Sequence, residues 1–228
     1  MKTIILSLLL SLSLMAQDHL AKYDISMKML GEIGKSTLSM HQTKDVYAIK
    51  MHIQMDKSLK DEEHSYESYG YIKDGVYIPE RFVKYIREGD KEVTSYYLFN
   101  HENQQIEKYT TIKENKSIFA LFSSDEKVVT KSFELLTEFT QNDTLTTFLN
   151  AKKLLNGKSQ MAVKSVGFRK NDRNISLHHT NGAYKLTIKD KEASDDYAIH
   201  VSISPDGLIQ NIMIQEYTML GNISVARN

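Results

Sequence analysis

Apolar and polar residues alternate along most of this chain. From Tyr47 to Met55 every second residue is apolar, and the residues between them are alanine, lysine, histidine and glutamine. The same period of two runs through residues 23–29, 184–188 and 197–203. Successive side chains of a β-strand point to opposite faces, so the alternation predicts strands that are buried on one face and exposed to solvent on the other. Strands of this kind are typical of antiparallel sheets.

Turn-forming residues separate these segments. Glycine-containing reversals lie at residues 31–34, 73–75, 89–90, 181–182 and 204–207. Asparagine–glycine pairs form tight turns that match the twist of two antiparallel strands, and Pro205 presets the backbone for a turn. We therefore expect about ten strands that follow one another as a meander.

One segment, QNDTLTTFLNAKKLLNGK at 141–158, has a helical pattern instead. Asn142 or Asp143 can cap its start, and Asn156-Gly157 can close its end in the left-handed conformation. Its apolar side chains gather on one face at Leu145, Phe148, Leu149 and Leu155. One helix of about a dozen residues is too small to cover such a sheet, so the sheet must curl on itself. The predicted fold is mainly β: a strongly curved antiparallel meander sheet, an incomplete barrel, with one short helix packed on the concave side.

The first 16 residues have the layout of a secretory leader. Lys2 gives a positive charge, residues 4–15 form an apolar run, and Ala16 precedes a polar residue. The run is shorter than the ~20 residues that a membrane-spanning helix needs. We expect a signal peptide over 1–16 and a single β-rich domain over 17–228 in the periplasm. An uncleaved membrane anchor is the alternative for the leader.

Composition excludes several classes of protein. Lysine plus arginine and aspartate plus glutamate both total 29, so no excess of positive charge favours nucleic acid. The chain has no cysteine, which excludes disulfides, thiolate zinc sites and a lipid attached to a cysteine after the leader. We expect a mature chain without a transmembrane segment, whose stability rests on its core alone.

Four segments, taken in order, resemble a family of exported bacterial proteins called domain of unknown function 3108. They are YDISMKMLGEIGKSTLSM at 23–40, DGVYIPERF at 74–82, NDTLTTFLNAKKLLNG at 142–157 and YTMLGNISVA at 217–226. The resemblance implies the periplasm of a Gram-negative bacterium. It also implies an architecture similar to the Lol lipoprotein carriers, an open curved sheet with helix over its concave side. The family has no assigned catalytic residues, so the resemblance transfers none.

Motifs of catalysis are missing from the sequence. The nucleophile elbow, the phosphate loop, the dinucleotide fingerprint and the zinc-binding His-Glu-x-x-His motif do not occur. Among the eight histidines only His178 and His179 adjoin, and on a strand they point to opposite faces. We therefore expect no catalytic residues, no metal and no cofactor, and we interpret the protein as a non-enzyme.

The apolar face of the predicted sheet is rich in methionine, a flexible and polarizable residue that adapts to varied apolar partners. Together with the apolar face of the helix it forms the predicted ligand-binding set: Tyr47, Met51, Met55, Met27, Met29, Leu145 and Phe148. We expect this set to bind a hydrophobic small molecule or lipid, with an acyl chain as the favoured ligand. The alternative is that the same residues simply pack against the helix.

Three functions remain open at this point. The first is a binding protein or carrier for a hydrophobic component of the cell envelope. The second is a structural or assembly partner of an envelope complex, because exposed strand edges can recruit another chain by strand addition. The third is an uncharacterised hydrolase. An apolar cavity would favour the first, a filled core with an apolar outer patch the second, and histidine and carboxylates converging in a cleft the third.

Overall fold

The computed structural model describes residues 17–58, 61–116, 126–167, 173–180, 183–188, 197–203, 209–218 and 221–228. These residues contain fourteen strands in one sheet. The strands are β1 (Gln17–Met27), β2 (Gly31–Gln42), β3 (Val46–Met55), β4 (Glu62–Lys73), β5 (Val76–Glu88), β6 (Lys91–Asn100), β7 (Gln105–Lys116), β8 (Glu126–Leu135), β9 (Gln160–Ser165), β10 (Arg173–Thr180), β11 (Ala183–Ile188), β12 (Tyr197–Ile203), β13 (Ile209–Thr218) and β14 (Gly221–Arg227).

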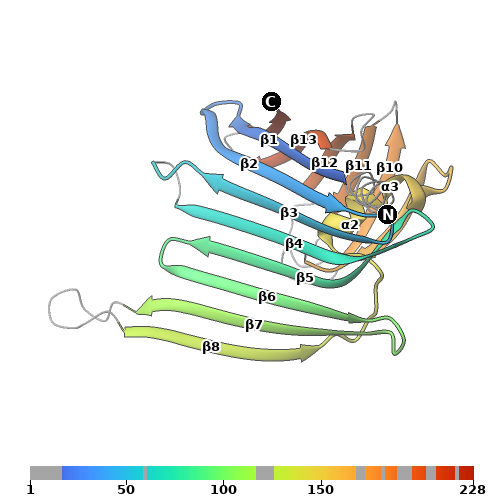
Figure 1. Cartoon of the computed structure of the whole chain (residues 1–228). Coiled ribbons are helices and arrows are strands. Elements are labelled where there is room, and N and C mark those ends of the chain that lie inside the picture. Colours follow the sequence, from blue (N-terminus) through green and yellow to red (C-terminus); the bar gives the residue numbers. More distant parts are fainter. Residues whose placement is uncertain are drawn as a thin grey trace, which may run out of the picture.

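The order of the strands explains how the sheet stays open. Strands β1–β8 follow one another along the sheet, β9–β14 do the same, and β14 pairs with β1. β8 and β9 are therefore the two edges, although they are consecutive strands of the chain. The chain between them carries the helices (Figure 1). The expected antiparallel meander that does not close into a barrel is confirmed, with fourteen described strands instead of about ten.

Residues with positive φ shape the hairpins. Asp74 (φ 54°) and Gly75 (φ 71°) form the two-residue turn between β4 and β5. Both central residues of this turn type need positive φ, which glycine adopts freely and aspartate tolerates. Gly89 (φ 56°) plays the same part in the next hairpin. The reversals expected at 181–182 and 204–207 lie outside the described residues.

Two short helices, α2 (Thr144–Leu149) and α3 (Ala151–Leu155), replace the single helix expected within 141–158. Asp143 caps α2 as expected, because its side chain accepts hydrogen bonds from two backbone N–H groups of the first turn. The helices meet at Asn150, whose side chain is hydrogen-bonded to the backbone of β5. A bond to a strand therefore divides a segment that the helical pattern alone presents as continuous.

The helices lie inside the curled end of the sheet. α2 contacts β4 and β5 on one side and β9 on the other, and α3 contacts β9 and β10. Figure 1 shows β6–β8 extending away from this end. The helices thus bridge two parts of the sheet that lie far apart in strand order.

The core lies on one face of the sheet, which we call the inner face; it carries Tyr23, Tyr47 and Ser68. Its buried apolar side chains from β1–β3 and β12–β14 are Ala21, Tyr23, Ile25, Met27, Ile33, Leu38, Met40, Tyr47, Ile49, Val201, Ile212, Ile223 and Val225. The Tyr23 hydroxyl reaches past β14 and donates to the carbonyl of Ile209 at 2.8 Å. Burial of each large aliphatic side chain stabilises the fold by roughly 1.5–3 kcal/mol. The alternation predicted for 23–27 and 47–49 is confirmed.

Candidate functional site

The structure brings most of the predicted ligand-binding set to the inner face. Met27, Tyr47 and Leu145 are buried in the core. The remaining members there, Met51, Met55 and Phe148, are half-buried and pack against it. Tyr47, Met51 and Met55 share one face of β3, as their spacing predicts.

Met29 is the exception, and its predicted place on the inner face is wrong. β1 ends at Met27, and residues 28–30 form the turn before β2. The Met29 side chain is 70% exposed in this turn. The alternation of 23–29 runs one residue pair too far, because Gly31 with φ 76° opens β2 earlier than the turn expected at 31–34.

A buried polar network holds α2 against β4. The Ser68 hydroxyl donates to Asp143 Oδ2 at 2.6 Å, and the Tyr47 hydroxyl lies 3.0 Å from Ser68 Oγ. Asp143 Oδ1 accepts from the backbone N–H of Leu145 and Thr146, both at 2.8 Å. Asp143 and Ser68 have no exposed surface. The side chain that caps the helix is thus also the anchor of the helix to the sheet.

Burial changes the acidity of this network. Desolvation raises the pKa of Asp143 from 3.8 to about 6, although its hydrogen bonds, that from Ser68 foremost, oppose the shift. Burial also raises the pKa of Tyr47 well above its usual range, and the neighbouring Asp143 adds to the rise. The carboxyl therefore titrates near neutral pH, while the phenol stays protonated.

Further polar side chains on the helices bind the backbone of β5 and a hydroxyl on β9. The Asn150 amide accepts from the N–H of Tyr77 at 2.9 Å and donates to its carbonyl at 2.8 Å. The Thr147 hydroxyl donates to Ser165 Oγ at 2.9 Å. We call Tyr47, Ser68, Asp143, Thr147 and Asn150 the clasp. The apolar pattern of the segment predicted an apolar contact between the helix and the sheet, whereas many of its buried side chains are polar.

Little free space remains on the inner face of the described residues. The space between Tyr23, Leu38, Met51, Ile209, Ile212 and Val225 is too small to hold a water molecule. Pockets for small ligands usually measure about 300–1,000 Å³. The predicted ligand-binding set therefore lines a largely filled interior, in which Met51 alone borders this space.

One histidine–carboxylate group lies on the inner face of β4. His64 Nε2 is 2.5 Å from Glu62 Oε1, and His64 Nδ1 is 3.1 Å from the Tyr66 hydroxyl. Both ring nitrogens thus have partners on β4 itself. Within the described ranges, no three histidine, aspartate or glutamate side chains gather to hold a metal, and no helix has the length and apolarity to cross a membrane.

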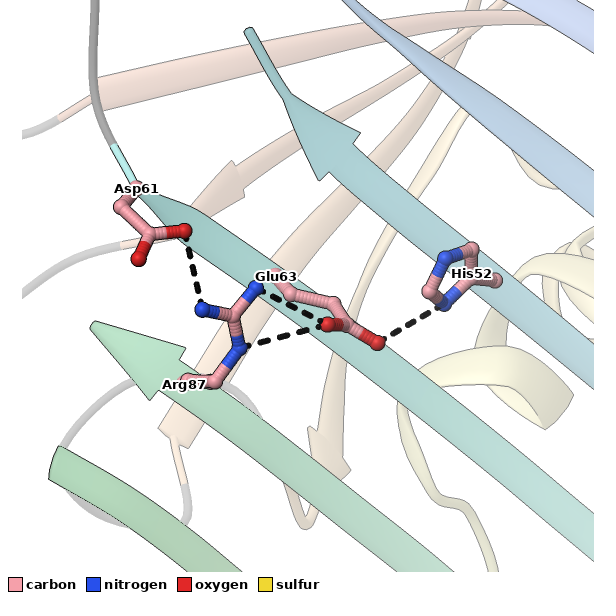
Figure 2. Close-up of polar contacts among 4 residues, drawn as sticks. All are labelled: His52, Asp61, Glu63 and Arg87. Atoms are coloured by element: carbon pink, nitrogen blue, oxygen red, sulfur yellow. Dashed lines mark hydrogen bonds and ion pairs between the residues drawn. The ribbon is translucent and has the colours of Figure 1, made fainter. Parts of the chain in front are cut away.

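The outer face of β3–β5 is covered by paired charges. Figure 2 shows Arg87 between Asp61 and Glu63, with His52 on the other side of Glu63. Arg87 Nη1 lies 2.9 Å from Asp61, and Nη2 lies 3.2 Å from Glu63. Lys50 pairs with Glu67 at 2.6 Å on the same face. This part of the outer face is an ordinary solvated surface.

The outer face of β6–β8 carries exposed apolar side chains among its polar ones, and Glu107 lies between Leu98 and Leu135. Five of these apolar side chains, which we call the outer patch, are Tyr96, Leu98, Tyr109, Phe133 and Leu135. The register places Tyr96, Tyr109 and Phe133 in one row across three strands, and the rings of Tyr109 and Phe133 are 5.1 Å apart. Their exposed fractions run from 40% to 59%. Large contiguous apolar patches on a protein surface mark interaction sites.

Sequence reasoning did not find the outer patch, although two signals point to it. Residues 96–99 read Tyr-Tyr-Leu-Phe, so β6 is apolar on both faces. In β8 the residues of the outer face are Val129, Lys131, Phe133 and Leu135, while Thr130, Ser132 and Glu134 point inward and are exposed. Val128 points inward and is half-buried, so the usual arrangement, apolar inside and polar outside, is reversed only over residues 132–135.

The two edges of the sheet are covered differently. At β9 the Lys164 carbonyl accepts from the Thr140 hydroxyl at 2.6 Å. Beyond its end, the Val166 N–H donates to the Asn142 carbonyl and the Val166 carbonyl accepts from Thr144, both at 3.1 Å. β8 has ten residues, and within the described part of the chain it pairs only with β7. An uncovered edge of this length is a template for another strand.

Comparison with known proteins agrees with this architecture. The model of the family DUF3108, described as protein of unknown function, matches residues 22–141. The chain belongs to the DUF3108 family. The resemblance to this family is thereby confirmed; the segments at 23–40 and 74–82 lie within the match, and those at 142–157 and 217–226 lie outside it. None of the curated proteins matches the chain.

A solved structure supports the fold of this DUF3108 protein. It is the crystal structure of a β-barrel-like protein of domain of unknown function DUF1849 from Brucella abortus. The two chains are 11% identical, with a TM-score of 0.52, and the match covers 92% of this chain and 95% of the other. At this identity the likeness concerns the fold alone, an open β-barrel-like sheet.

Proposed function

We propose that this DUF3108 protein is a non-enzymatic component of the cell envelope that binds another polypeptide through the outer patch and the adjoining edge of β8. The observation that carries the proposal is the row of Tyr96, Tyr109 and Phe133, which ends at β8, a strand that pairs only with β7 among the described strands. The secretory layout of residues 1–16, which lie outside the described residues, supports a periplasmic location.

Physical chemistry favours a protein partner for this surface. Aromatic side chains supply most of the binding energy at protein interfaces when a partner removes them from water. The outer patch offers three aromatic rings and two leucines on a regular sheet face, held in place by the β-ladder. Tyr109 also donates from its hydroxyl to Glu107 at 2.7 Å, so its ring is held in one orientation. Such a surface loses little conformational entropy when a partner binds.

A second candidate function is the binding of an acyl chain or other lipid on the inner face. One observation supports it: Met51, Met55 and Phe148 are half-buried apolar side chains that pack against the core on this face. An acyl chain would have to displace core side chains, because the space beside Met51 is too small to hold a water molecule. The filled interior and the apolar outer patch together favour the polypeptide-binding function.

The test compares the two surfaces in living cells. Three proteins are compared, and in each a photo-crosslinking amino acid replaces Tyr109. The first has no other change, the second also carries Phe133→Lys, and the third also carries Met51→Ala. We expect a discrete crosslinked protein species that Phe133→Lys removes and Met51→Ala retains. Crosslinking that survives Phe133→Lys, or no crosslinked product at all, would contradict the proposal. Titration of delipidated protein with a fluorescent fatty acid tests the second candidate, which predicts saturable binding weakened by Met51→Ala.

A further inference from the structure

The register of the sheet defines what a strand added at β8 would meet. Each outer-face row runs across β6 and β7 and ends at one residue of β8. One row consists of Thr94, Thr111 and Lys131, and the next consists of Tyr96, Tyr109 and Phe133. Directly opposite residues of neighbouring strands form the pairs that stabilise a sheet. A new strand would therefore place one residue beside each of Val129, Lys131, Phe133 and Leu135.

Among the described residues, Lys131 lacks the kind of ion pair that Lys108 and Lys113 of the neighbouring strand β7 form. Lys108 pairs with Glu134 at 3.0 Å, and Lys113 lies 3.7 Å from Glu92. Lys131 is exposed, and its neighbour on β7 is Thr111. None of the ion pairs among the described residues includes Lys131. A positive charge without a counter-charge thus stands between two apolar residues of the edge strand.

A second copy that adds as an antiparallel strand does not satisfy that charge. Two β8 strands related by a twofold axis perpendicular to the sheet keep their outer residues on the outer face, so Lys131 would meet an odd-numbered residue of the other β8. The odd-numbered residues of β8 are lysine, valine, lysine, phenylalanine and leucine, and none is acidic. Pairing of two copies leaves Lys131 beside another lysine or an apolar side chain, and like charges or a lone charge destabilise a pair.

We infer that the edge of β8 receives an extended segment of a different protein, which adds as an antiparallel strand and places a carboxylate opposite Lys131 between apolar residues opposite Val129 and Phe133. The inference rests on the proposed function and names the partner's chemistry. Read from its N-terminus, the segment has the pattern apolar-x-aromatic-x-acidic-x-apolar. Backbone hydrogen bonds along β8 provide affinity, and the charge and the outer patch provide selectivity.

The experiment uses two labelled peptides and two forms of the full domain. The acidic peptide is Val-Thr-Tyr-Thr-Asp-Thr-Val, and the basic peptide carries Lys in place of Asp. Fluorescence anisotropy measures the affinity of each for the wild type and for Lys131→Glu. We expect the wild type to bind the acidic peptide about fivefold more tightly than the basic one, and Lys131→Glu to reverse this preference. Hydrogen exchange of the β8 amides should slow when the acidic peptide binds.

Each other outcome has a defined meaning. Equal affinities in all four combinations, or binding without slower exchange in β8, would overturn the inference. Sedimentation that shows a dimer of the protein alone, dissociated by Phe133→Lys, would assign the surface to a second copy and overturn it too. If both peptides fail to bind while crosslinking from position 109 still depends on Phe133, the inference is overturned and the proposed function stands. Loss of the crosslink itself overturns the proposed function.

Discussion

The two edges of this sheet are consecutive in the chain and opposite in character. β9 has six residues, and the segment 140–144, which ends at the first residue of α2, forms hydrogen bonds with Lys164 and with Val166 just beyond the strand. β8 has ten residues, pairs only with β7 among the described strands, and turns its apolar side chains outward. Among the described residues, the segment before and at the start of α2 covers part of one edge, and none covers the other. Proteins commonly shield long edges against unwanted pairing, and the proposed function gives the β8 edge a partner.

The comparison extends to the role of polar groups. Near β9 the polar side chains are buried and bonded, as in the clasp, and they determine how the helices sit. On β8 the polar side chains of Thr130, Ser132 and Glu134 face inward and are exposed, while Phe133 and Leu135 face water together with Lys131. We expect changes at the β9 edge to alter stability and changes at the β8 edge to alter binding. The following predictions test this division, from the largest effect on stability to the smallest.

The largest loss of stability is expected for Gly167→Ala, just beyond β9. Gly167 has φ 89°, and a Cβ there would lie 2.1 Å from Cε1 of the buried Phe82. Backbone strain and overpacking together should lower the free energy of unfolding by about 3–5 kcal/mol. Gly89→Ala is the matched control, because Gly89 has φ 56° and no atom within 4 Å of the added Cβ; about 1–2 kcal/mol is expected. Equal losses in chemical denaturation would show that the crowded end of β9 is not a tight contact.

Asn150→Ala should have the next largest effect. The change removes the two hydrogen bonds between the Asn150 side chain and the backbone of Tyr77. The N–H and carbonyl of Tyr77, a half-buried residue, then lose these partners. We expect a loss of about 2–4 kcal/mol in the free energy of unfolding. Asn100→Ala, which removes a hydrogen bond in an exposed turn, should cost about 1 kcal/mol or less. A difference near zero between the two variants would mean that Asn150 does not anchor the helices to β5.

The pH dependence of stability should report on Asp143. Its pKa rises from 3.8 to about 6 on folding, so the folded state binds more protons than the unfolded state between these values. The contribution of Asp143 is greatest below about pH 4 and declines as pH rises through 6, by about 3 kcal/mol at most. Asp143→Asn keeps a capping oxygen and should lack this decline in denaturation curves from pH 3 to 8. A variant less stable than wild type at pH 8 would show that the hydrogen bonds to the carboxylate outweigh its burial.

Phe133→Lys should have the smallest effect on stability and a large effect on binding. The side chain is 59% exposed, so the free energy of unfolding should change by about 0.5 kcal/mol or less. The crosslink from position 109 should nevertheless disappear, because a charge replaces the end of the aromatic row. Phe82→Ala provides the inner-face contrast, with an expected loss of about 3–5 kcal/mol for a fully buried ring. Unfolding of Phe133→Lys at ordinary temperature would place Phe133 in the core instead of at an interface.

Much of the fold follows from local signals in the sequence. The period of two places Tyr23, Ile25, Tyr47 and Ile49 on the buried face, because strand geometry alone alternates the side chains. Asp143 and Asn156 mark the ends of the helical segment, because caps depend on a few neighbouring residues. The small amount of helix against so much strand indicates an open, curled sheet before any pairing is known.

Only the tertiary structure decided which face of each strand is covered by another part of the chain. Met29 continues the alternation in sequence but lies in a turn, because the hairpin with β2 begins at Met27. Thr147 and Asn150 are polar, yet they are buried because Ser165 and the backbone of β5 supply their hydrogen bonds from distant parts of the chain. Phe133 is apolar, yet it faces water because the helices lie on the other face, at the end held by β4, β5 and β9. Periodicity describes a strand's two faces; long-range pairing determines which of them is covered.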